Sequence, residues 1–177
     1  GTGPARLVFE RVAPELEVAV TAPDGARVGK GEVVLRVAGP LRGILTAERT
    51  ALNFLVRLSG IATLTCRFVE AVAGTGATIL DTRKTTPGWR LLEKEAVRAG
   101  GGGNHRLGLF DMVLVKDNHL VAAGGVRAAV GGVREANRRG LPVEVEVNSL
   151  EELQELLPLG CGRHRMVEVP GHQHVPL

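Results

Sequence analysis

Aromatic residues are scarce in this sequence of 177 residues: they make up 3% of it, and tyrosine is absent altogether. Proteins that hold single-stranded nucleic acid combine a basic groove with aromatic side chains on which the bases stack. The net charge of +3 is only mildly basic. A nucleic-acid-binding module is therefore not favoured, and we expect no nucleic-acid partner.

Cysteines and long apolar runs are also scarce. The two cysteines, Cys66 and Cys161, are far apart and match no metal-binding or redox spacing, which argues against a disulfide scaffold and favours a reducing cytoplasm. No stretch approaches the roughly 18 uninterrupted apolar residues of a membrane helix, and no signal peptide opens the chain. We expect no membrane span. The sequence starts at Gly1 rather than Met, so we expect it to begin inside a longer protein.

Apolar residues are plentiful, at 44%, which is enough for a globular core. Residues 1–43 are predicted to be β-rich, with alternating strands at 16–20 and 32–37. From Thr46 the apolar spacing becomes helical, which predicts two helices with a bend at Ser59 and Gly60.

The rest of the chain alternates strands and helices. Such alternation with short connections predicts a parallel sheet covered by helices, hence an α/β fold. The last 17 residues, 161–177, give one possible short strand at 166–169 and no helix. The predicted strands are 77–80, 112–115 and 142–147, and the predicted helices are 88–99, 126–138 and one that follows a capping box of Ser149 and Glu152.

The strand Val143–Val147 has an unusual face. Alternation sends Glu144 and Glu146 to one side and the valines to the other, and a polar inner face fits a barrel lumen or an active-site mouth. Polar residues also follow the two preceding strands, at 82–84 and 116–118. Because parallel barrels place catalytic groups at the carboxyl ends of their strands, these positions predict a site.

Lysine is rare here, with 4 lysines against 18 arginines, and two of the four, Lys84 and Lys116, come directly after predicted strands. With Arg49, Arg83 and Arg106 they would form a pocket for several anionic groups, because guanidinium forks suit carboxylate and phosphate. The alternative is that each cation is an ordinary solvated charge, as most charged residues are.

Residues 100–103 are four consecutive glycines, followed by Asn104, His105 and Arg106. No Lys-Ser/Thr pair follows the glycines, so a nucleotide P-loop is not supported. The run is either a flexible hinge or a close approach of the backbone. It delivers His105 and Arg106 beside the strand ends, which makes a site role as plausible as a structural one.

The two carboxylates of the third strand have several possible uses. They could bind a divalent cation, act as a general acid/base pair, or neutralise neighbouring cations. Glu146 lies nearer the carboxyl end and is our functional candidate, with Glu144 as ion-paired support. The histidines outside residue 105 lack a second ligand at a suitable spacing, so a histidine metal cage is not expected.

Taken together, the motifs around the candidate residues resemble those of the quinolinate phosphoribosyltransferase family, also called nicotinate-nucleotide pyrophosphorylase (carboxylating). The resemblance covers about residues 7–160 and involves motifs in a fixed order. The matching strings are AERTALNFL (47–55), LSGIAT (58–63), DTRKTTPG (81–88), GGGNHRLGL (101–109), KDNH (116–119) and EVEV (144–147).

The resemblance implies an incomplete, β-rich α+β sandwich domain at residues 1–46, a truncated α/β barrel domain at residues 47–160 and an aberrant C-terminal tail at residues 161–177. It also implies a homodimer or larger assembly with shared active sites. It also implies the reaction: quinolinate and 5-phosphoribosyl 1-diphosphate, with Mg²⁺, give nicotinate mononucleotide, pyrophosphate and CO₂ for NAD biosynthesis. The family's substrate-binding positions fall on Arg49, Thr82, Arg83, Lys84, His105, Arg106, Lys116 and Glu146.

Individual roles follow from the same resemblance. Arg83, Arg106 and an Arg49 from the neighbouring subunit would hold the two carboxylates of quinolinate. Lys84 and Lys116 would lie near the pyrophosphate and the ring. Glu146 would fix the ribose hydroxyls and meet Mg²⁺ only through the substrate. Lys84, Lys116 and Glu146 are the expected catalytic residues.

Two departures from the family pattern leave alternatives open. Asn148 stands where an acidic residue is usual, and the pattern is lost after Gly160. The chain could therefore be a catalytically inactive truncated fragment, or a relative that acts on another pyridine base such as nicotinate. We expect the 177-residue chain to be inactive by itself.

Overall fold

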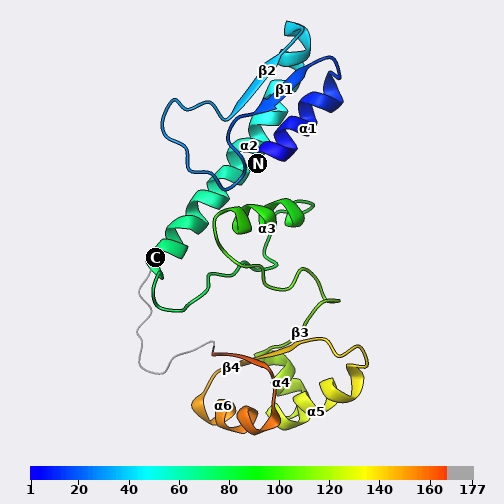
Figure 1. Ribbon diagram of the computed structural model, residues 1–177. Helices are drawn as coiled ribbons and strands as arrows, with labels where there is room; N and C mark the ends of the chain where they lie inside the picture. Colours follow the sequence, from blue (N-terminus) through cyan, green and yellow to red (C-terminus); the bar gives the residue numbers. More distant parts are fainter. Residues whose placement is uncertain (167–177) are drawn as a thin grey trace. The chain divides into compact units, whose positions relative to one another are not determined.

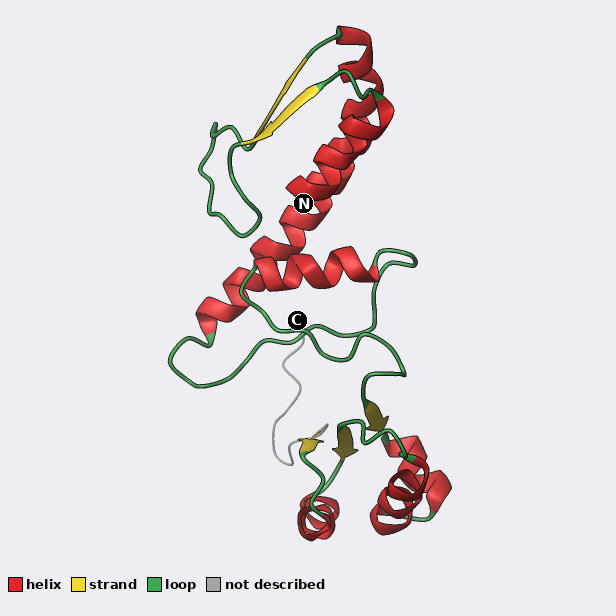
Figure 2. Ribbon diagram, turned by 45° about the vertical axis from the view of Figure 1, so that its right-hand side comes forward, coloured by secondary structure: helices red, strands yellow, loops and turns green. Residues whose placement is uncertain are grey.

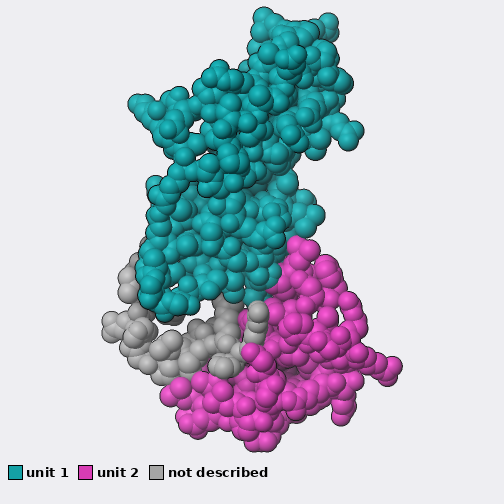
Figure 3. All heavy atoms as spheres, in the orientation of Figure 1, with its two compact units in different colours: residues 1–105 teal, residues 106–177 magenta. Residues whose placement is uncertain are grey.

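The computed structural model describes residues 1–166, and these form two compact units that Figure 3 colours separately. Unit 1 is Gly1–His105, and unit 2 begins at Arg106. Both mix helices with small sheets, so the chain has the α/β composition that the sequence predicts.

The first part of unit 1 is a helix, a hairpin and a long helix around one apolar core. The two strands pair antiparallel, with Glu17 opposite Ala38, and lie close to the strands predicted at 16–20 and 32–37. The helix α1 is a correction to the β-rich prediction for residues 1–43: Phe9 and Ala5 lie one turn apart and pack against Ala47 of the long helix. The elements are α1 (Thr2–Val12), β1 (Glu17–Val20), β2 (Leu35–Ala38) and α2 (Leu41–Ala71).

The predicted bend at Ser59 and Gly60 is wrong, because α2 is one continuous helix of 31 residues (Figure 2). A glycine inside a helix costs only about 1 kcal/mol relative to alanine. Packing along the helix offsets that cost, since α1 and α3 (Arg90–Ala99) both contact α2. Tertiary contacts therefore keep α2 helical through Gly60.

By length and composition alone, α2 would be long and apolar enough to cross a membrane, a property that it shares with core helices of many globular proteins. Ala47, Ala51 and Leu58 are its buried apolar side chains, and Ala47 and Ala51 lie in the core shared with α1 and the hairpin. These contacts favour a packed helix of unit 1, and the absence of a membrane partner stays a prediction.

The second part of unit 1 is held together without a regular sheet. The strand predicted at 77–80 is wrong: a single parallel bridge joins Leu80 to Gly103. The glycine run is a close approach of the backbone rather than a hinge. A Cβ atom on Gly102 would lie 2.8 Å from side-chain carbons of both Thr65 and Val97. The glycines thus let this segment pack directly on α2 and α3.

Unit 2 is a three-stranded parallel sheet in the order β3-β4-β5, which confirms the predicted parallel pairing. The strand expected at 166–169 lies instead at Arg163–Met166, and residues 167–169 are outside the described part of the chain. The short helix α4 was not predicted. The elements are β3 (Val113–Val115), α4 (Asp117–Ala123), α5 (Val126–Ala136), β4 (Val143–Val147), α6 (Leu150–Leu156), a 3₁₀ turn at Leu157–Leu159 and β5 (Arg163–Met166).

The core of unit 2 lies on the valine face of β4, as alternation predicts. Val145 and Val147 are fully buried in a cluster with residues of α4, α5 and α6, among them Leu156. The three helices lie together below the strands in Figure 1. Because the helices cover the valine face, Glu144 and Glu146 belong to the opposite face.

The predicted helix start at Ser149 is confirmed. Ser149 Oγ accepts a hydrogen bond from Glu152 N at 3.2 Å, and the Glu152 carboxylate accepts one from Asn148 N at 2.7 Å. The return bond thus reaches one residue further back than in a standard capping box.

Candidate active-site residues

Residues 82–85 of unit 1 form a tight turn that displays two of the predicted cations. Thr82 Oγ1 accepts from Lys84 N at 3.1 Å, and the Arg83 carbonyl accepts from Thr85 N at 3.0 Å. The Lys84 side chain is exposed, whereas Arg83 is half-buried. The Thr82 hydroxyl therefore shapes the turn that carries the cations.

The start of this turn is held by Asp81, through a network that the sequence did not predict. Asp81 Oδ1 pairs with Lys94 Nζ of α3 and accepts a hydrogen bond from His105 N at 2.9 Å. Asp81 Oδ2 accepts from Asn104 Nδ2 at 2.6 Å. Lys94 is 4% exposed, so this is a buried ion pair, and it ties the 82–85 turn to the segment that carries His105.

The end of the turn is held by Glu93, the residue that precedes Lys94 on α3. Its carboxylate accepts from Thr86 N at 3.2 Å and from Arg57 Nη2 of α2 at 2.7 Å. Burial raises the pKa of Glu93, but the hydrogen bonds from Arg57 and Thr86 outweigh burial and hold that pKa below its ordinary value. Glu93 is therefore ionised in the neutral range and braces the turn against both helices.

Arg49 lies on α2, exposed, and lines a groove of about 680 Å³ within unit 1. The groove is closed on the other side by Thr86 and Trp89, and the Trp89 ring stacks on Phe54 of α2 with 4.7 Å between ring centroids. Arg49 and Arg57 both line this groove, so two guanidinium groups border it. The groove thus joins the predicted residue Arg49 to the end of the turn at Thr86.

Arg106 opens unit 2, and its side chain is 8% exposed. One guanidinium nitrogen donates to the Met112 carbonyl at 3.3 Å. The loop between these residues is closed by Asp111, which accepts from Leu107 N at 2.6 Å and from Gly108 N at 3.0 Å. Part of the guanidinium therefore supports the chain that leads into β3.

Lys116 and Glu146 lie at the same edge of the unit 2 sheet, as the strand-end argument predicts. Val115 of β3 pairs with Val145 of β4 in the parallel register. Lys116 and Glu146 are the residues that follow this pair in sequence. Lys116 is exposed and Glu146 is half-buried. His119 fixes the backbone here, because its Nδ1 accepts from Lys116 N at 3.0 Å. A cation and a carboxylate thus come from adjacent strand ends.

No group of three or more His, Cys, Asp or Glu side chains suited to a metal ion occurs in the part of the chain that the structure describes. Mg²⁺ is commonly held by one or two carboxylates together with substrate phosphates and water. The single half-buried carboxylate of Glu146 fits that mode, and its contact with Mg²⁺ through the substrate stays a prediction.

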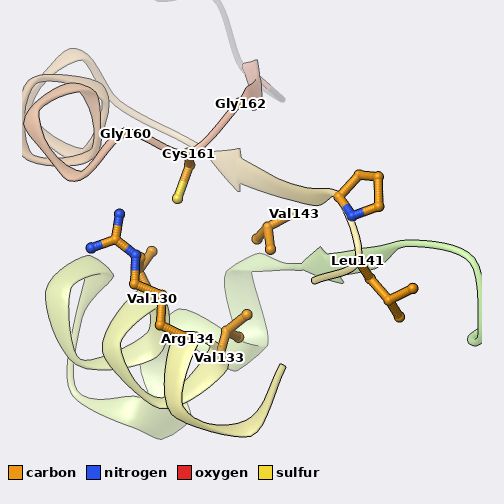
Figure 4. A pocket seen from close by; sticks show the side chains of 9 residues that line it. Val130, Val133, Arg134, Leu141, Val143, Gly160, Cys161 and Gly162 are labelled. Carbon is orange, nitrogen blue, oxygen red and sulfur yellow. The ribbon is translucent and has the colours of Figure 1, made fainter. Parts of the chain in front are cut away.

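A cavity of about 410 Å³ lies at the other end of the unit 2 strands (Figure 4). It is lined by Pro142 and Val143 at the start of β4 and by Val130 of α5, and the Cys161 side chain points toward that helix. None of the predicted site residues lines this cavity.

The predicted site residues therefore fall into two groups. The structure brings Thr82, Arg83, Lys84 and His105 together in unit 1 through Asp81, and places Arg49 on a groove that reaches Thr86. In unit 2 it brings Lys116 beside Glu146, with Arg106 in the chain that precedes β3. Sequence reasoning missed Glu93 and Lys94, although the rarity of lysine was a signal for Lys94.

Comparison with known proteins matches almost the whole described chain to the two domains of one protein family. Residues 1–59 match the family model of the N-terminal domain of quinolinate phosphoribosyl transferase, and residues 61–166 match that of its C-terminal domain. A nicotinate-nucleotide pyrophosphorylase [carboxylating] of Mycobacterium leprae is 52% identical over 159 residues, which cover 89% of this chain and 56% of the relative.

Two further relatives extend the comparison. A chloroplastic nicotinate-nucleotide pyrophosphorylase [carboxylating] of Arabidopsis thaliana is 48% identical over 165 residues, covering 92% of this chain and 47% of the relative. The crystal structure of NadC from Streptococcus pyogenes superposes with a TM-score of 0.85 at 44% identity, over 88% of this chain and 55% of that one. The chain thus spans about half the length of the relatives that it matches.

Proposed function

Because this chain belongs to the quinolinate phosphoribosyl transferase family, we propose that its protein transfers a phosphoribosyl group from 5-phosphoribosyl 1-diphosphate to quinolinate. The products are nicotinate mononucleotide, pyrophosphate and CO₂, as in NAD biosynthesis. The observation that carries the proposal is the braced turn of unit 1: Arg83 and Lys84 are displayed between two buried polar anchors at Asp81 and Glu93.

The charges of the substrates explain the need for such a turn. Quinolinate is a dianion and the cosubstrate carries several phosphates, so their approach requires a cationic pocket. Arg83 and Arg106 hold the carboxylates, because arginine binds carboxylate in a bidentate manner. Lys84 and Lys116 neutralise the pyrophosphate. Thr82 and His105 complete the contacts with the substrates.

Glu146 binds the ribose hydroxyls while positive charge develops at C1. Mg²⁺, which Glu146 would meet only through the substrate, would supply positive charge for the departing pyrophosphate. The ring nitrogen attacks C1 with its lone pair, and pyrophosphate leaves with the electrons of the C1–O bond. The ring nitrogen is then positively charged. Its positive charge stabilises the electron pair that stays on the adjacent ring carbon when the carboxylate departs as CO₂, and that carbon then takes a proton from solvent. Lys84, Lys116 and Glu146 are the catalytic residues in this scheme.

The architecture of the whole protein forms part of the same proposal. Unit 2 has helices packed on the valine face of its parallel sheet and carboxylates on the other face, which supports a β/α barrel with the carboxylates toward its lumen. Arg49 is exposed on α2 beside the exposed apolar residues Leu45 and Val56. This supports a homodimer or larger assembly in which Arg49 serves the neighbouring subunit. The cytoplasm is the proposed location, on the separate ground of the two widely spaced cysteines.

The test compares quinolinate with nicotinate as acceptor, using the protein in its natural full length and following nicotinate mononucleotide and CO₂. We expect product from quinolinate alone. Lys116→Ala should lower kcat/KM at least 100-fold with little change in the melting temperature, because an exposed strand-end charge contributes little to the core. Lys30→Ala, which removes an exposed lysine of unit 1, is the matched control. Product from nicotinate, or equal effects of both variants, would contradict the proposal.

A further inference from the structure

We propose that Lys94 and Asp81 are positioning residues of this active site: their buried ion pair sets the places of the 82–85 turn and of His105 at the same time. This inference rests on the function proposed above and concerns residues outside the proposed substrate-binding set. It follows from the connections that the pair makes within unit 1.

Lys94 holds the His105 segment by its backbone. Its ammonium group donates to the His105 carbonyl at 2.9 Å while it pairs with Asp81. Asp81 accepts from the amide of the same residue, His105, at 2.9 Å. Both main-chain polar groups of His105 are therefore bound to the two partners of one ion pair, which fixes the orientation of the backbone on each side of this residue.

Asn104 closes the network from the other side. Its side-chain amide donates to Asp81 Oδ2 at 2.6 Å and to the Lys94 carbonyl at 2.9 Å. One side chain thus links the carboxylate to the backbone of α3. Three segments that are distant in sequence, at residues 81, 94 and 104–105, are joined by these side-chain bonds. The β-pairing beside them is an isolated bridge between Leu80 and Gly103 rather than a sheet.

The energetics favour a positioning role over a purely stabilising one. A buried salt bridge adds little net stability, because the desolvation of both charges offsets their attraction. Lys94 is 4% exposed, and the Asp81 side chain is also buried. The pair instead fixes an orientation. Asp81 directly precedes Thr82, Arg83 and Lys84 in sequence, so its fixed carboxylate orients the start of the cationic turn.

The experiment separates positioning from stability with a charge-balanced pair of variants. Lys94→Met leaves the Asp81 carboxylate buried without its ammonium partner, and should lower both the melting temperature and kcat/KM for quinolinate. Asp81→Asn combined with Lys94→Met removes both charges, so the melting temperature should return toward that of the wild type. We expect kcat/KM to stay at least 10-fold lower in this double variant, because a displacement of about 1 Å can cost 100-fold in rate.

Lys30→Met, at an exposed position of unit 1, is the control and should keep kcat/KM within twofold. All variants are made in the protein at its natural full length. If the double variant recovers both the melting temperature and kcat/KM, or if it stays destabilised, the pair serves folding and the inference is wrong. If the wild-type protein forms no product from quinolinate, the proposed function is wrong. If the wild type is active and the variants have the same kcat/KM, the proposed function stands and the positioning role is wrong.

Discussion

Unit 1 and unit 2 hold their candidate residues by different means. In unit 2, Lys116 and Glu146 follow a hydrogen-bonded parallel ladder that is supported by an apolar core. In unit 1, the 82–85 turn follows a single bridge, and side-chain ion pairs at Lys94 and Glu93 replace the ladder. A polar side chain can thus be held in place either by backbone hydrogen bonds of a sheet or by buried ion pairs. The stability of the two units should therefore respond differently to mutation and to pH.

The largest effect is expected from the apolar core of unit 2. Leu156→Ala removes a side chain that is 1% exposed in the cluster around Val145. Because the space left by the missing side chain is filled only partly by its neighbours, the free energy of unfolding of unit 2 should fall by about 2–5 kcal/mol. Hydrogen exchange should show faster exchange in β3 and β4, with the Gly103 amide of unit 1 unchanged.

Leu150→Ala, on the same helix but 53% exposed, is the control and should change the free energy of unfolding by less than about 0.5 kcal/mol. An equal increase of exchange in both units after Leu156→Ala would contradict the contrast between them, since it would show that they share one core.

A smaller effect is expected from the glycine run that replaces sheet packing in unit 1. Gly102→Ala would place a Cβ atom 2.8 Å from carbons of Thr65 and Val97, and both neighbours are branched at Cβ. Overpacking of this kind costs about 1–3 kcal/mol, which calorimetry of the variant measures. The effect should be confined to unit 1.

Gly60→Ala is the matched control for Gly102→Ala, because its Cβ would meet no atom within 4 Å in the described residues. It should stabilise α2 by up to about 1 kcal/mol, since alanine is the better helix former. A stabilising Gly102→Ala would show that the close approach is not limiting.

The smallest loss of stability is expected at Glu93, and its pH dependence tests whether a charged carboxylate anchors the turn. The pKa of Glu93 is held below its ordinary value of 4.5 in the folded protein, so its contribution to stability is present above pH 4.5 and is lost as the pH falls through the folded pKa. Glu93→Gln should cost about 1 kcal/mol at pH 7, because hydrogen bonds to a charged group are the stronger ones. Melting temperatures between pH 7 and 3 should fall less steeply in this variant than in the wild type.

Glu95→Gln is the control for Glu93→Gln, because Glu95 lies on the same helix with its carboxylate exposed and paired with the exposed Arg98. Parallel pH profiles of the wild type and Glu93→Gln would mean that the anchor at Thr86 does not depend on charge.

What could be predicted from the sequence depended on the range of the interactions involved. The alternation in Val143–Val147 and the capping residue Ser149 are local signals, and both are confirmed. The continuity of α2 through Gly60 is set by packing partners elsewhere in the chain. Periodicity cannot show such partners, so the predicted bend was wrong.

The same limit applies to the candidate site. The strand ends at Lys116 and Glu146 were found because β periodicity is local and parallel strands end at a common edge. The pairing of Asp81 with Lys94 joins a loop to a helix, and no local pattern encodes it. The motif strings had drawn attention to Arg83 and Lys84, but the residues that brace them lie outside the short patterns that periodicity detects.

The stack of Trp89 on Phe54 makes unit 1 optically distinct. Trp89 is the single tryptophan of the chain, and there is no tyrosine to contribute emission. Its indole stacks on Phe54 of α2 and borders the groove with Arg49. Intrinsic fluorescence excited at the indole band therefore reports on this groove alone, and any difference between its unfolding curve and that of far-ultraviolet circular dichroism measures how far the two units unfold independently.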